Sequence, residues 1–217
     1  MPKDTAPAWT PVALSADLPA ASVIPARLAD AALALWRSAG GTVSAVADRC
    51  PHRGMRLSHG FVRGEALSCI YHGWRYAKTG RCLAIPAHPG LTPPEAIRVA
   101  TYSAAERDGI LWVAAGEDAG APPAHDGFAG LRSITLAATA ETLAACLGTP
   151  LSDGGLEWSV RETRARLLIA PAAEDGSILL HLLLAADATD AEKVAASRAL
   201  ETLRRTAEAA AVTGEAA

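Results

Sequence analysis

Cys50-Pro51-His52-Arg53-Gly54 and Cys69-Ile70-Tyr71-His72-Gly73-Trp74 are the two stretches that decide the fold of this chain. Each offers one thiol and one imidazole, spaced as Cys-x-His in the first stretch and as Cys-x-x-His in the second. A glycine follows each histidine closely, and glycine lets a backbone wrap tightly around a bound group and donate N–H groups to it. The two stretches therefore predict a metal centre built from two loops.

Two kinds of metal centre use two cysteines and two histidines. A Rieske 2Fe–2S cluster binds one iron through two cysteines and the other iron through two histidines. A structural zinc site also uses this set, but zinc fingers place Cys with Cys and His with His. Because both loops here are mixed, the spacing favours the 2Fe–2S cluster over zinc. The expected ligands are Cys50, His52, Cys69 and His72.

Length, charge and hydropathy bound the class of protein. The chain has 217 residues, half of them apolar, and a formal net charge of −3. That length can bury a core in one large domain or two small ones, and the charge gives no reason to expect nucleic acid or a membrane as a partner. No apolar run reaches the ~18 residues of a membrane span, and residues 1–4 lack the layout of a secretory signal. We therefore expect a cytoplasmic protein, in which cysteines serve metal or redox chemistry more often than disulfides.

Short strands separated by turns fill residues 9–116 in the sequence pattern. Such regular spacing with Gly-rich turns is typical of an antiparallel β-sandwich or small barrel. Residues 116–125 are rich in Gly, Ala and Pro and are expected to be a linker, so we place a first domain at 1–120 and a second at 121–217. The expected strands of the first domain are 31–37, 42–47, 66–70, 74–76, 97–102 and 110–115.

The second domain is expected to be a small α+β unit. Its last helix is amphipathic, with Val194, Leu200 and Leu203 on one side, and Asp187 or Asp190 is the expected N-cap. The expected elements are strands at 131–138, 157–170 and 177–186, a short helix at 141–147 and the long helix at 191–211.

Several other polar residues have an ordinary structural explanation as well as a functional one. His59 and His88 are expected on the surface, His125 in solvent within the linker, and His181 as a buried residue of a sheet. Cys82 and Cys146 have no partner at ligand spacing and are expected to be small buried side chains. Four arginines near the loops are either ordinary surface charge or a docking patch for an acidic redox partner. They are Arg53, Arg56, Arg63 and Arg75.

Together the motifs resemble the N-terminal Rieske domain of the aromatic-ring and O-demethylating Rieske oxygenases, the vanillate O-demethylase-like group. The resemblance covers about residues 9–116 and implies a Rieske β-sandwich in which Cys50 and Cys69 bind the buried ferric iron and His52 and His72 the outer one. It rests on Trp9-x-Pro-Val-Ala, on residues 48–54 and 71–76, on Gly80-Arg81-Cys82 and Ile85-Pro86, and on residues 102–113.

The resemblance also bears on the reduction potential. High-potential Rieske proteins of respiratory complexes carry a disulfide beside the cluster and a serine whose hydroxyl stabilises the reduced form. Here the corresponding positions are Met55, Tyr71 and Trp74. Missing donors near the sulfurs lower the potential, so we expect a value toward the bottom of the roughly −150 to +300 mV range. Such a cluster suits electron transfer from a flavin or ferredoxin-type reductase toward oxygen chemistry.

Oxygenase subunits of this family continue into a helix-grip domain with a mononuclear iron on two closely spaced histidines and a carboxylate. Beyond residue 116 this sequence has only His125 and His181, and neither has a partner at helical spacing. The resemblance therefore implies a shortened helix-grip-like domain at 121–217, without mononuclear iron and with no catalytic residue to assign.

Two hypotheses about function remain. In the first, the chain is an electron-transfer protein that forms an oligomer with, or feeds, a separate Rieske oxygenase subunit. In the second, it is itself a terminal ring-hydroxylating or demethylating oxygenase, with an unrecognised iron site on residues such as Asp153, Glu157 and His181. Iron content separates them, because the first predicts two irons per chain and the second predicts three.

Overall fold

The computed structural model of the chain describes residues 9–29, 31–116, 119–152, 155–171 and 175–214. The chain divides into two compact units. The first consists of Trp9 with Ser15–Glu106 and Leu111–Pro122, and the second of Thr10–Leu14, Arg107–Ile110 and Pro123–Ala217. The sequence places a boundary at residue 120, and the compact units add two short segments of the N-terminal half to the second unit.

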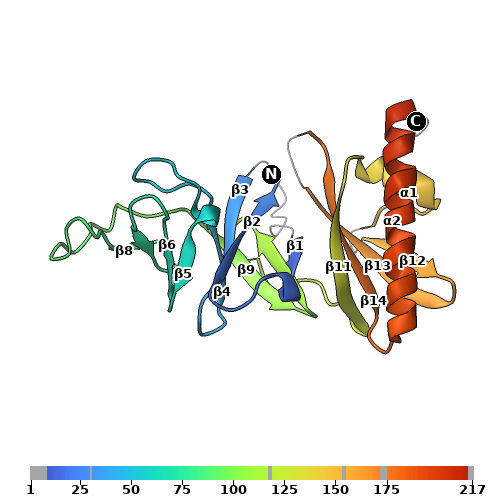
Figure 1. Cartoon of the computed structure of the whole chain (residues 1–217), viewed down its shortest axis with the longest axis horizontal. Helices are drawn as coiled ribbons and strands as arrows, with labels where there is room; N and C mark the ends of the chain where they lie inside the picture. Colours follow the sequence, from blue (N-terminus) through green and yellow to red (C-terminus); the bar gives the residue numbers. More distant parts are fainter. Residues whose placement is uncertain (1–8, 30, 117–118, 153–154, 172–174, 215–217) are drawn as a thin grey trace, which may run out of the picture. The chain divides into compact units, whose positions relative to one another are not determined.

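The N-terminal half is built from short β-strands, as the sequence predicts. One sheet has the strand order β1-β10-β9-β4-β3-β2, and a smaller antiparallel sheet has the order β5-β6-β7-β8. In Figure 1 the smaller sheet is the teal and green group around β5, β6 and β8. The bounds are β1 (Thr10–Leu14), β2 (Ser22–Leu28), β3 (Ala31–Arg37), β4 (Val43–Ala47), β5 (Phe61–Arg63), β6 (Ala66–Ser68), β7 (Arg75–Tyr76), β8 (Cys82–Ala84), β9 (Thr101–Arg107) and β10 (Ile110–Ala114), with short 3-10 helices η1 (Ser15–Asp17) and η2 (Leu57–His59).

The hairpin of β3 and β4 confirms the pair of strands predicted at 31–37 and 42–47. Ser38 closes its turn, because its N–H donates to the Thr42 carbonyl over 2.9 Å and its hydroxyl accepts from the Thr42 N–H over 3.1 Å. Gly41 takes a φ of 90°, which favours glycine. The register opposes Trp36 to Ser44 and directs Trp36 into a core that also holds Tyr76 and the two ligand-candidate cysteines.

Other strands of this half differ from expectation. The strand expected at 97–102 is β9, which begins at Thr101, and β1, β2, β5 and β8 were not predicted as strands. β2 contains Pro25 and is mostly half-buried, so it lacks both alternation and a full set of donors. It lies at one end of its sheet, where a proline is tolerated in a strand.

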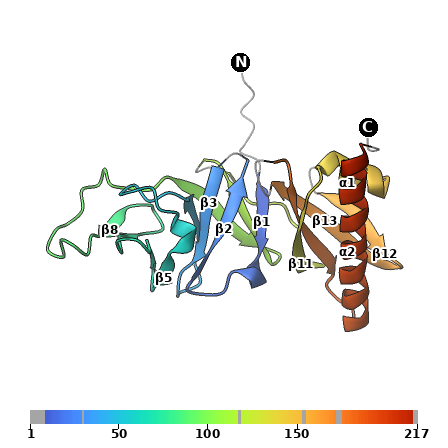
Figure 2. The ribbon, with the colours of Figure 1, turned by 45° about the horizontal axis from the view of Figure 1, so that its top comes forward.

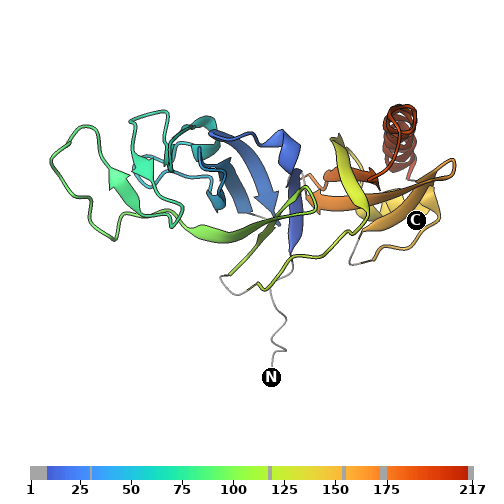
Figure 3. The same ribbon diagram turned by 90° about the horizontal axis from the view of Figure 1, so that it is seen from below.

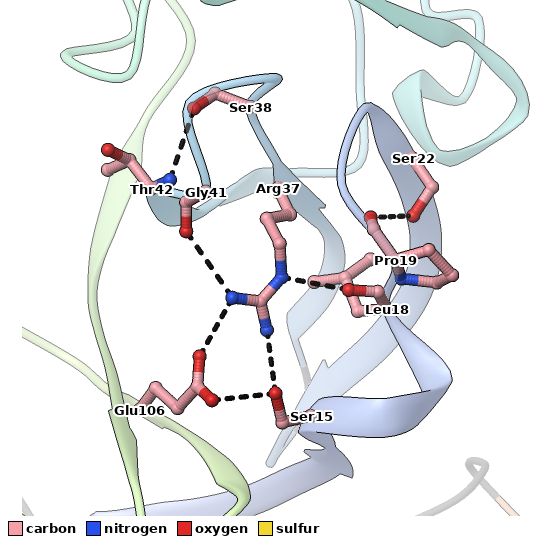
Figure 4. A network of polar contacts seen from close by, with 9 residues as sticks. All are labelled: Ser15, Leu18, Pro19, Ser22, Arg37, Ser38, Gly41, Thr42 and Glu106. Atoms are coloured by element: carbon pink, nitrogen blue, oxygen red, sulfur yellow. Dashed lines mark hydrogen bonds and ion pairs between the residues drawn. The ribbon is translucent and has the colours of Figure 1, made fainter.

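A polar network around Arg37 joins η1 to β9 (Figure 4). The guanidinium donates to Glu106 over 2.8 Å, to the Ser15 hydroxyl over 2.9 Å and to the Leu18 carbonyl over 2.8 Å. Burial raises the pKa of Glu106, but hydrogen bonds from Ser15 and Arg37 outweigh it and lower that pKa overall. The network therefore ties the segment of η1, near the start of the first unit, to β3 and β9.

The second unit is a four-stranded antiparallel sheet with two helices. Its strand order is β11-β14-β13-β12. α2 contacts β11, β12 and β14, and Figures 2 and 3 show it along one face of this sheet. The elements are β11 (Phe128–Leu136), α1 (Ala140–Leu147), β12 (Leu156–Val160), β13 (Thr163–Pro171), β14 (Ile178–Ala185) and α2 (Asp190–Thr213).

Leucine fills the space between this sheet and its helices. The buried cluster contains members from the sheet and from both helices, and its leucines are at most 9% exposed. They are Leu136, Leu143, Leu156, Leu167, Leu180, Leu182, Leu184, Leu200 and Leu203. Leu200 and Leu203 of the apolar face predicted for the last helix therefore serve as core, whereas Val194, predicted on the same face, is 51% exposed.

Two predictions for this half were wrong in detail. The single strand expected at 157–170 is a hairpin of β12 and β13, turned at Arg161 with a φ of 56°. The cap of α2 is Thr189, not Asp187 or Asp190, because Thr189 and Glu192 form a capping box in which each side chain bonds the other's backbone N–H. No helix in the described residues is long and apolar enough to cross a membrane.

Candidate metal centre

The first loop follows β4 and closes on itself. The Cys50 N–H donates to the Met55 carbonyl over 2.8 Å, and the Gly54 N–H donates to the Cys50 carbonyl over 2.8 Å. Asp48, two residues before the cysteine, accepts from the N–H and the hydroxyl of Ser58, both over 2.7 Å. These bonds hold both ends of the loop to one frame, so the positions of its thiol and imidazole are set locally.

The second loop lies between β6 and β7 and closes in the same way. The Cys69 N–H donates to the Trp74 carbonyl over 2.9 Å, and the Gly73 N–H donates to the Cys69 carbonyl over 3.0 Å. Gly73 has a φ of 70°, and a Cβ added there would lie 3.1 Å from Pro86 Cγ. Glycine is therefore required both by conformation and by the close approach of Pro86.

The two loops place their histidines side by side. The ring centroids of His52 and His72 are 4.6 Å apart, with the rings inclined at 64°. His52 is half-buried and His72 is exposed. Both imidazoles thus lie on the outer side of the centre, within reach of one group.

The two cysteines lie beneath, each only 2% exposed. Cys50 and the backbone N–H groups of Tyr71 and His72 all act on the Cys69 thiol. Burial raises the pKa of the Cys69 thiol, and the two N–H donors oppose that rise. Converging backbone donors of this kind stabilise a sulfur ligand that carries negative charge.

This donor set fits a two-iron cluster. Among the residues that the structure describes, no three His, Cys, Asp or Glu side chains converge to hold a single metal ion. A Rieske cluster does not need three, because each iron takes two protein ligands and its other bonds go to sulfide. Two buried thiols and two adjacent imidazoles supply that arrangement.

Tyr76 is a residue of the centre that the sequence analysis missed. Its phenol oxygen lies 3.1 Å from Cys50 Sγ, and the side chain is fully buried. Burial and the nearby Cys50 strongly raise the pKa of the phenol, so it stays protonated and can donate to a thiolate. The expectation that donors are missing near the sulfurs is therefore wrong at Cys50. The only signal in the sequence was a tyrosine two residues after Trp74.

Aromatic rings flank both histidines. Trp74 stacks flat on His52, with centroids 4.5 Å apart and planes inclined by 4°. The Tyr71 ring lies 3.9 Å from that of His72. Partial burial, together with His72 and Arg53, lowers the pKa of His52. The indole at position 74 thus supports an imidazole instead of supplying a hydroxyl donor.

The remaining sequence candidates fall outside this centre. His59 and His88 are exposed, as expected, and so are Arg53, Arg56, Arg63 and Arg75. Cys82 is fully buried in the same core as Tyr76, whereas Cys146 is only half-buried. Arg63 lies over Phe61, with its guanidinium carbon 4.8 Å from the ring centroid.

His125 corrects the prediction of a solvated linker residue. It is 2% exposed, its N–H donates to Asp108 over 2.7 Å, and Arg166 donates to its Nδ1 over 2.8 Å. Burial, and then Arg166, lower its pKa. The residue is part of the second unit because it pairs with side chains distant in sequence.

His181 confirms the expected buried sheet residue. It is 0% exposed, Ser133 lies 2.8 Å from its Nδ1, and its Nε2 lies 3.1 Å from the Pro11 carbonyl. A ring whose two nitrogens are both used is not open to a metal. Glu157 pairs with Arg166, and Asp153 lies outside the described residues.

With this geometry in hand, the comparisons with known proteins agree on the first unit. Residues 8–103 match the family described as Rieske [2Fe-2S] domain. This part of the chain is a Rieske [2Fe–2S] domain, and a 2Fe–2S cluster is its cofactor.

Sequence relatives include an oxidoreductase and several oxygenases. Over 115 residues the chain is 44% identical to "Oxidoreductase NdmD" of Pseudomonas putida, which covers 52% of this chain and 20% of that protein. Over 89 residues it is 44% identical to "4beta-methylsterol monooxygenase" of Methylococcus capsulatus, covering 40% of this chain and 24% of that protein. The chain thus matches about a fifth to a quarter of the length of these curated relatives.

Solved structures share the fold over nearly the whole chain. A Pseudomonas putida CBB5 NdmA mutant with caffeine aligns with a TM-score of 0.74 at 21% identity, covering 93% of this chain and 81% of that one. Apo dicamba monooxygenase aligns with a TM-score of 0.75 at 20% identity, covering 95% and 86%. At this identity the likeness establishes the fold alone, and it shows a mainly β, Rieske-oxygenase-like architecture.

Proposed function

We propose that the chain is a Rieske electron-transfer component of an oxygenase-type system, with Cys50 and Cys69 on one iron and His52 and His72 on the other. When bound, the cluster supplies one-electron transfer. The observation that carries the proposal is the pairing of two buried thiols with two imidazoles whose ring centroids are 4.6 Å apart.

The surrounding residues support this role. Burial keeps water from the two thiols, while the exposed His72 leaves an edge at which electrons can enter and leave. Tyr76 holds a proton directed at Cys50, and Trp74 and Pro86 fix the second loop and the His52 ring. The chain's own side chains therefore orient the centre and separate its buried thiol side from its solvent-exposed histidine side.

The sequence relatives of the Rieske domain suggest which proteins act as its partners. We propose a flavin or ferredoxin-type reductase as electron donor and a Rieske oxygenase subunit, of the vanillate O-demethylase-like group, as acceptor, in a cytoplasmic oligomer. Relatives carrying such a domain include both an oxidoreductase and "Methylxanthine N1-demethylase NdmA", 42% identical over 69 residues. The four cysteines are all free of disulfides, in keeping with a reducing compartment.

For the second unit we propose a reduced helix-grip-like domain at 121–217 without an iron of its own. Leucines occupy the space between its sheet and α2. The terminal-oxygenase alternative has less support, because His181 uses both ring nitrogens and Glu157 is paired with Arg166.

Iron quantification on anaerobically purified protein tests the proposal. We expect two irons and two acid-labile sulfides per chain, with the EPR signal of a reduced Rieske cluster after dithionite. One metal per chain without sulfide, identified as zinc, would contradict the cluster assignment. Three irons per chain would favour the terminal-oxygenase alternative.

A further inference from the structure

Positive charge is concentrated around the two cluster loops. Residues 48–98 contain eight arginines and lysines against three acidic residues, whereas the rest of the chain contains twelve against twenty. The chain as a whole is acidic, so this segment stands out from its surroundings. Patches of one sign in a protein of the opposite net charge attract partners of complementary charge.

The arginines of this segment are not used to hold the fold. Arg53, Arg56 and Arg75 are exposed and make no ion pair or side-chain hydrogen bond with any residue that the structure describes. Elsewhere in the chain four arginines each pair with a glutamate. They are Arg37, Arg132, Arg166 and Arg204.

Two large apolar side chains project from the second loop itself. Ile70 and Tyr71, between the ligand candidates Cys69 and His72, are each 57% exposed. Arg53 directly follows His52 in the chain, and Arg75 follows Trp74, which stacks on the same histidine. Exposed apolar side chains together with nearby exposed charges are the composition of a protein-docking surface.

We propose that Arg53, Arg56, Ile70, Tyr71 and Arg75 form a docking surface, here called the cluster face, for a separate redox protein that is acidic around an apolar centre. This rests on the proposed function and names the chemistry of the partner. A second copy of the chain is the competing occupant, and the sedimentation measurement below distinguishes it from a separate redox protein. Apolar contact places the partner over His72, and the arginines speed and orient its approach.

Stopped-flow reduction by a prereduced acidic plant-type [2Fe–2S] ferredoxin provides the test. We expect the second-order rate to fall steeply with salt. Arg53→Glu and Arg75→Glu should each lower it on the order of tenfold at low salt, and Ile70→Ser should lower it with little change in salt dependence. The matched control is Arg198→Glu, the same charge reversal at an exposed position of α2.

Reduction by dithionite separates the two proposals. If dithionite does not reduce any cluster in the wild-type chain, the proposed function fails. If each variant keeps the visible spectrum and its dithionite reduction, but the ferredoxin rate is independent of salt and equal to that of Arg198→Glu, the cluster face is wrong. Arg53→Gln replaces Arg53→Glu if the reversal disturbs the cluster. Salt-dependent self-association in sedimentation that Arg53→Glu abolishes would identify a second copy as the occupant, and would overturn the choice of partner.

Discussion

The phenol oxygen of Tyr76 lies 3.1 Å from the sulfur of Cys50, inside a core that excludes water from both. A hydrogen bond to a charged acceptor is worth about 1.5–3 kcal/mol. It strengthens when the sulfur becomes more electron-rich, so it favours the reduced centre. The tyrosine therefore raises the reduction potential of the cluster, whereas the absence of a serine hydroxyl lowers it.

Replacement of Tyr76 by phenylalanine should lower the reduction potential. We expect a fall on the order of 60 mV, equivalent to about 1.4 kcal/mol for one electron, with the 2Fe–2S absorption retained. Potentiometry at fixed pH checks it, and Tyr102→Phe, at a half-buried position in β9, is the matched control. An unchanged potential would mean that the phenol does not donate to the cluster ligand.

Each of the four proposed ligands should be indispensable to the cluster. Cys50→Ser, His52→Ala, Cys69→Ser and His72→Ala each remove one of the two protein ligands of an iron. We expect loss of the visible absorption and of the reduced-state EPR signal. Cys146→Ser, at a half-buried cysteine of α1, should keep both. Full spectra in any of the four would show that its ligand assignment is wrong.

An alanine at position 73 should strain the second loop. Gly73 has a φ of 70°, and a Cβ there would lie 3.1 Å from Pro86 Cγ. We expect a loss of about 1–2 kcal/mol in the free energy of unfolding, measured by denaturant titration of the cluster-loaded protein. Gly90→Ala is the control, because a Cβ there meets nothing within 4 Å. Equal stability of the two variants would show that neither the positive φ nor the close approach of Pro86 costs stability.

Acid should weaken the second unit through Glu192. Hydrogen bonds from Thr189 and Thr163 lower its pKa to about 2 from an ordinary value of 4.5. Because the folded-state pKa is depressed, its contribution is fully present above pH 4.5 and is lost as pH falls toward 2. Thermal unfolding is measured from pH 6 to 2. The midpoint temperature of Glu192→Gln should fall less steeply with decreasing pH than that of wild type. The control Glu162→Gln, exposed beside the β12–β13 turn, should show the same pH dependence of the midpoint as wild type. If Glu192→Gln also showed the wild-type pH dependence, the role assigned to Glu192 would be wrong.

The chain with a reductase alone should not consume oxygen with aromatic substrates. No three ligand side chains converge on a single metal ion among the described residues, and the interior of the second unit is filled with leucine. We expect oxygen uptake only when an iron-loaded oxygenase subunit is added. An oxygen electrode measures it, and substrate-dependent uptake without that subunit would promote the terminal-oxygenase alternative.

The sequence identifies the candidate centre because its signal is local. Each loop carries its own Cys, His and Gly within a few residues, and each loop closes by backbone bonds between those same positions. Tyr76 escaped because its role depends on reaching Cys50, 26 residues away, across the small sheet. His125 was misread for the same reason, since Arg166, which binds it, lies 41 residues further along.

Element boundaries show the same limit. The turn at Arg161 takes a positive φ without a glycine or asparagine to announce it, so two strands read as one. The start of α2 was misplaced because two nearby aspartates competed with Thr189, and only the reciprocal bonds to Glu192 identify the cap. The hairpin of β3 and β4 was found because its apolar runs flank a Gly-Gly turn.

The matching closure of the two loops, each with a pair of backbone bonds between the same relative positions, has a consequence for the speed of electron transfer. An electron moves quickly when the atoms around the acceptor hardly shift between its two charge states. Loops tied to their own backbone, with thiols shielded from solvent, leave few dipoles free to reorient. The reorganisation energy then comes mainly from the water and side chains outside the two imidazoles. A partner that docks there can displace this water.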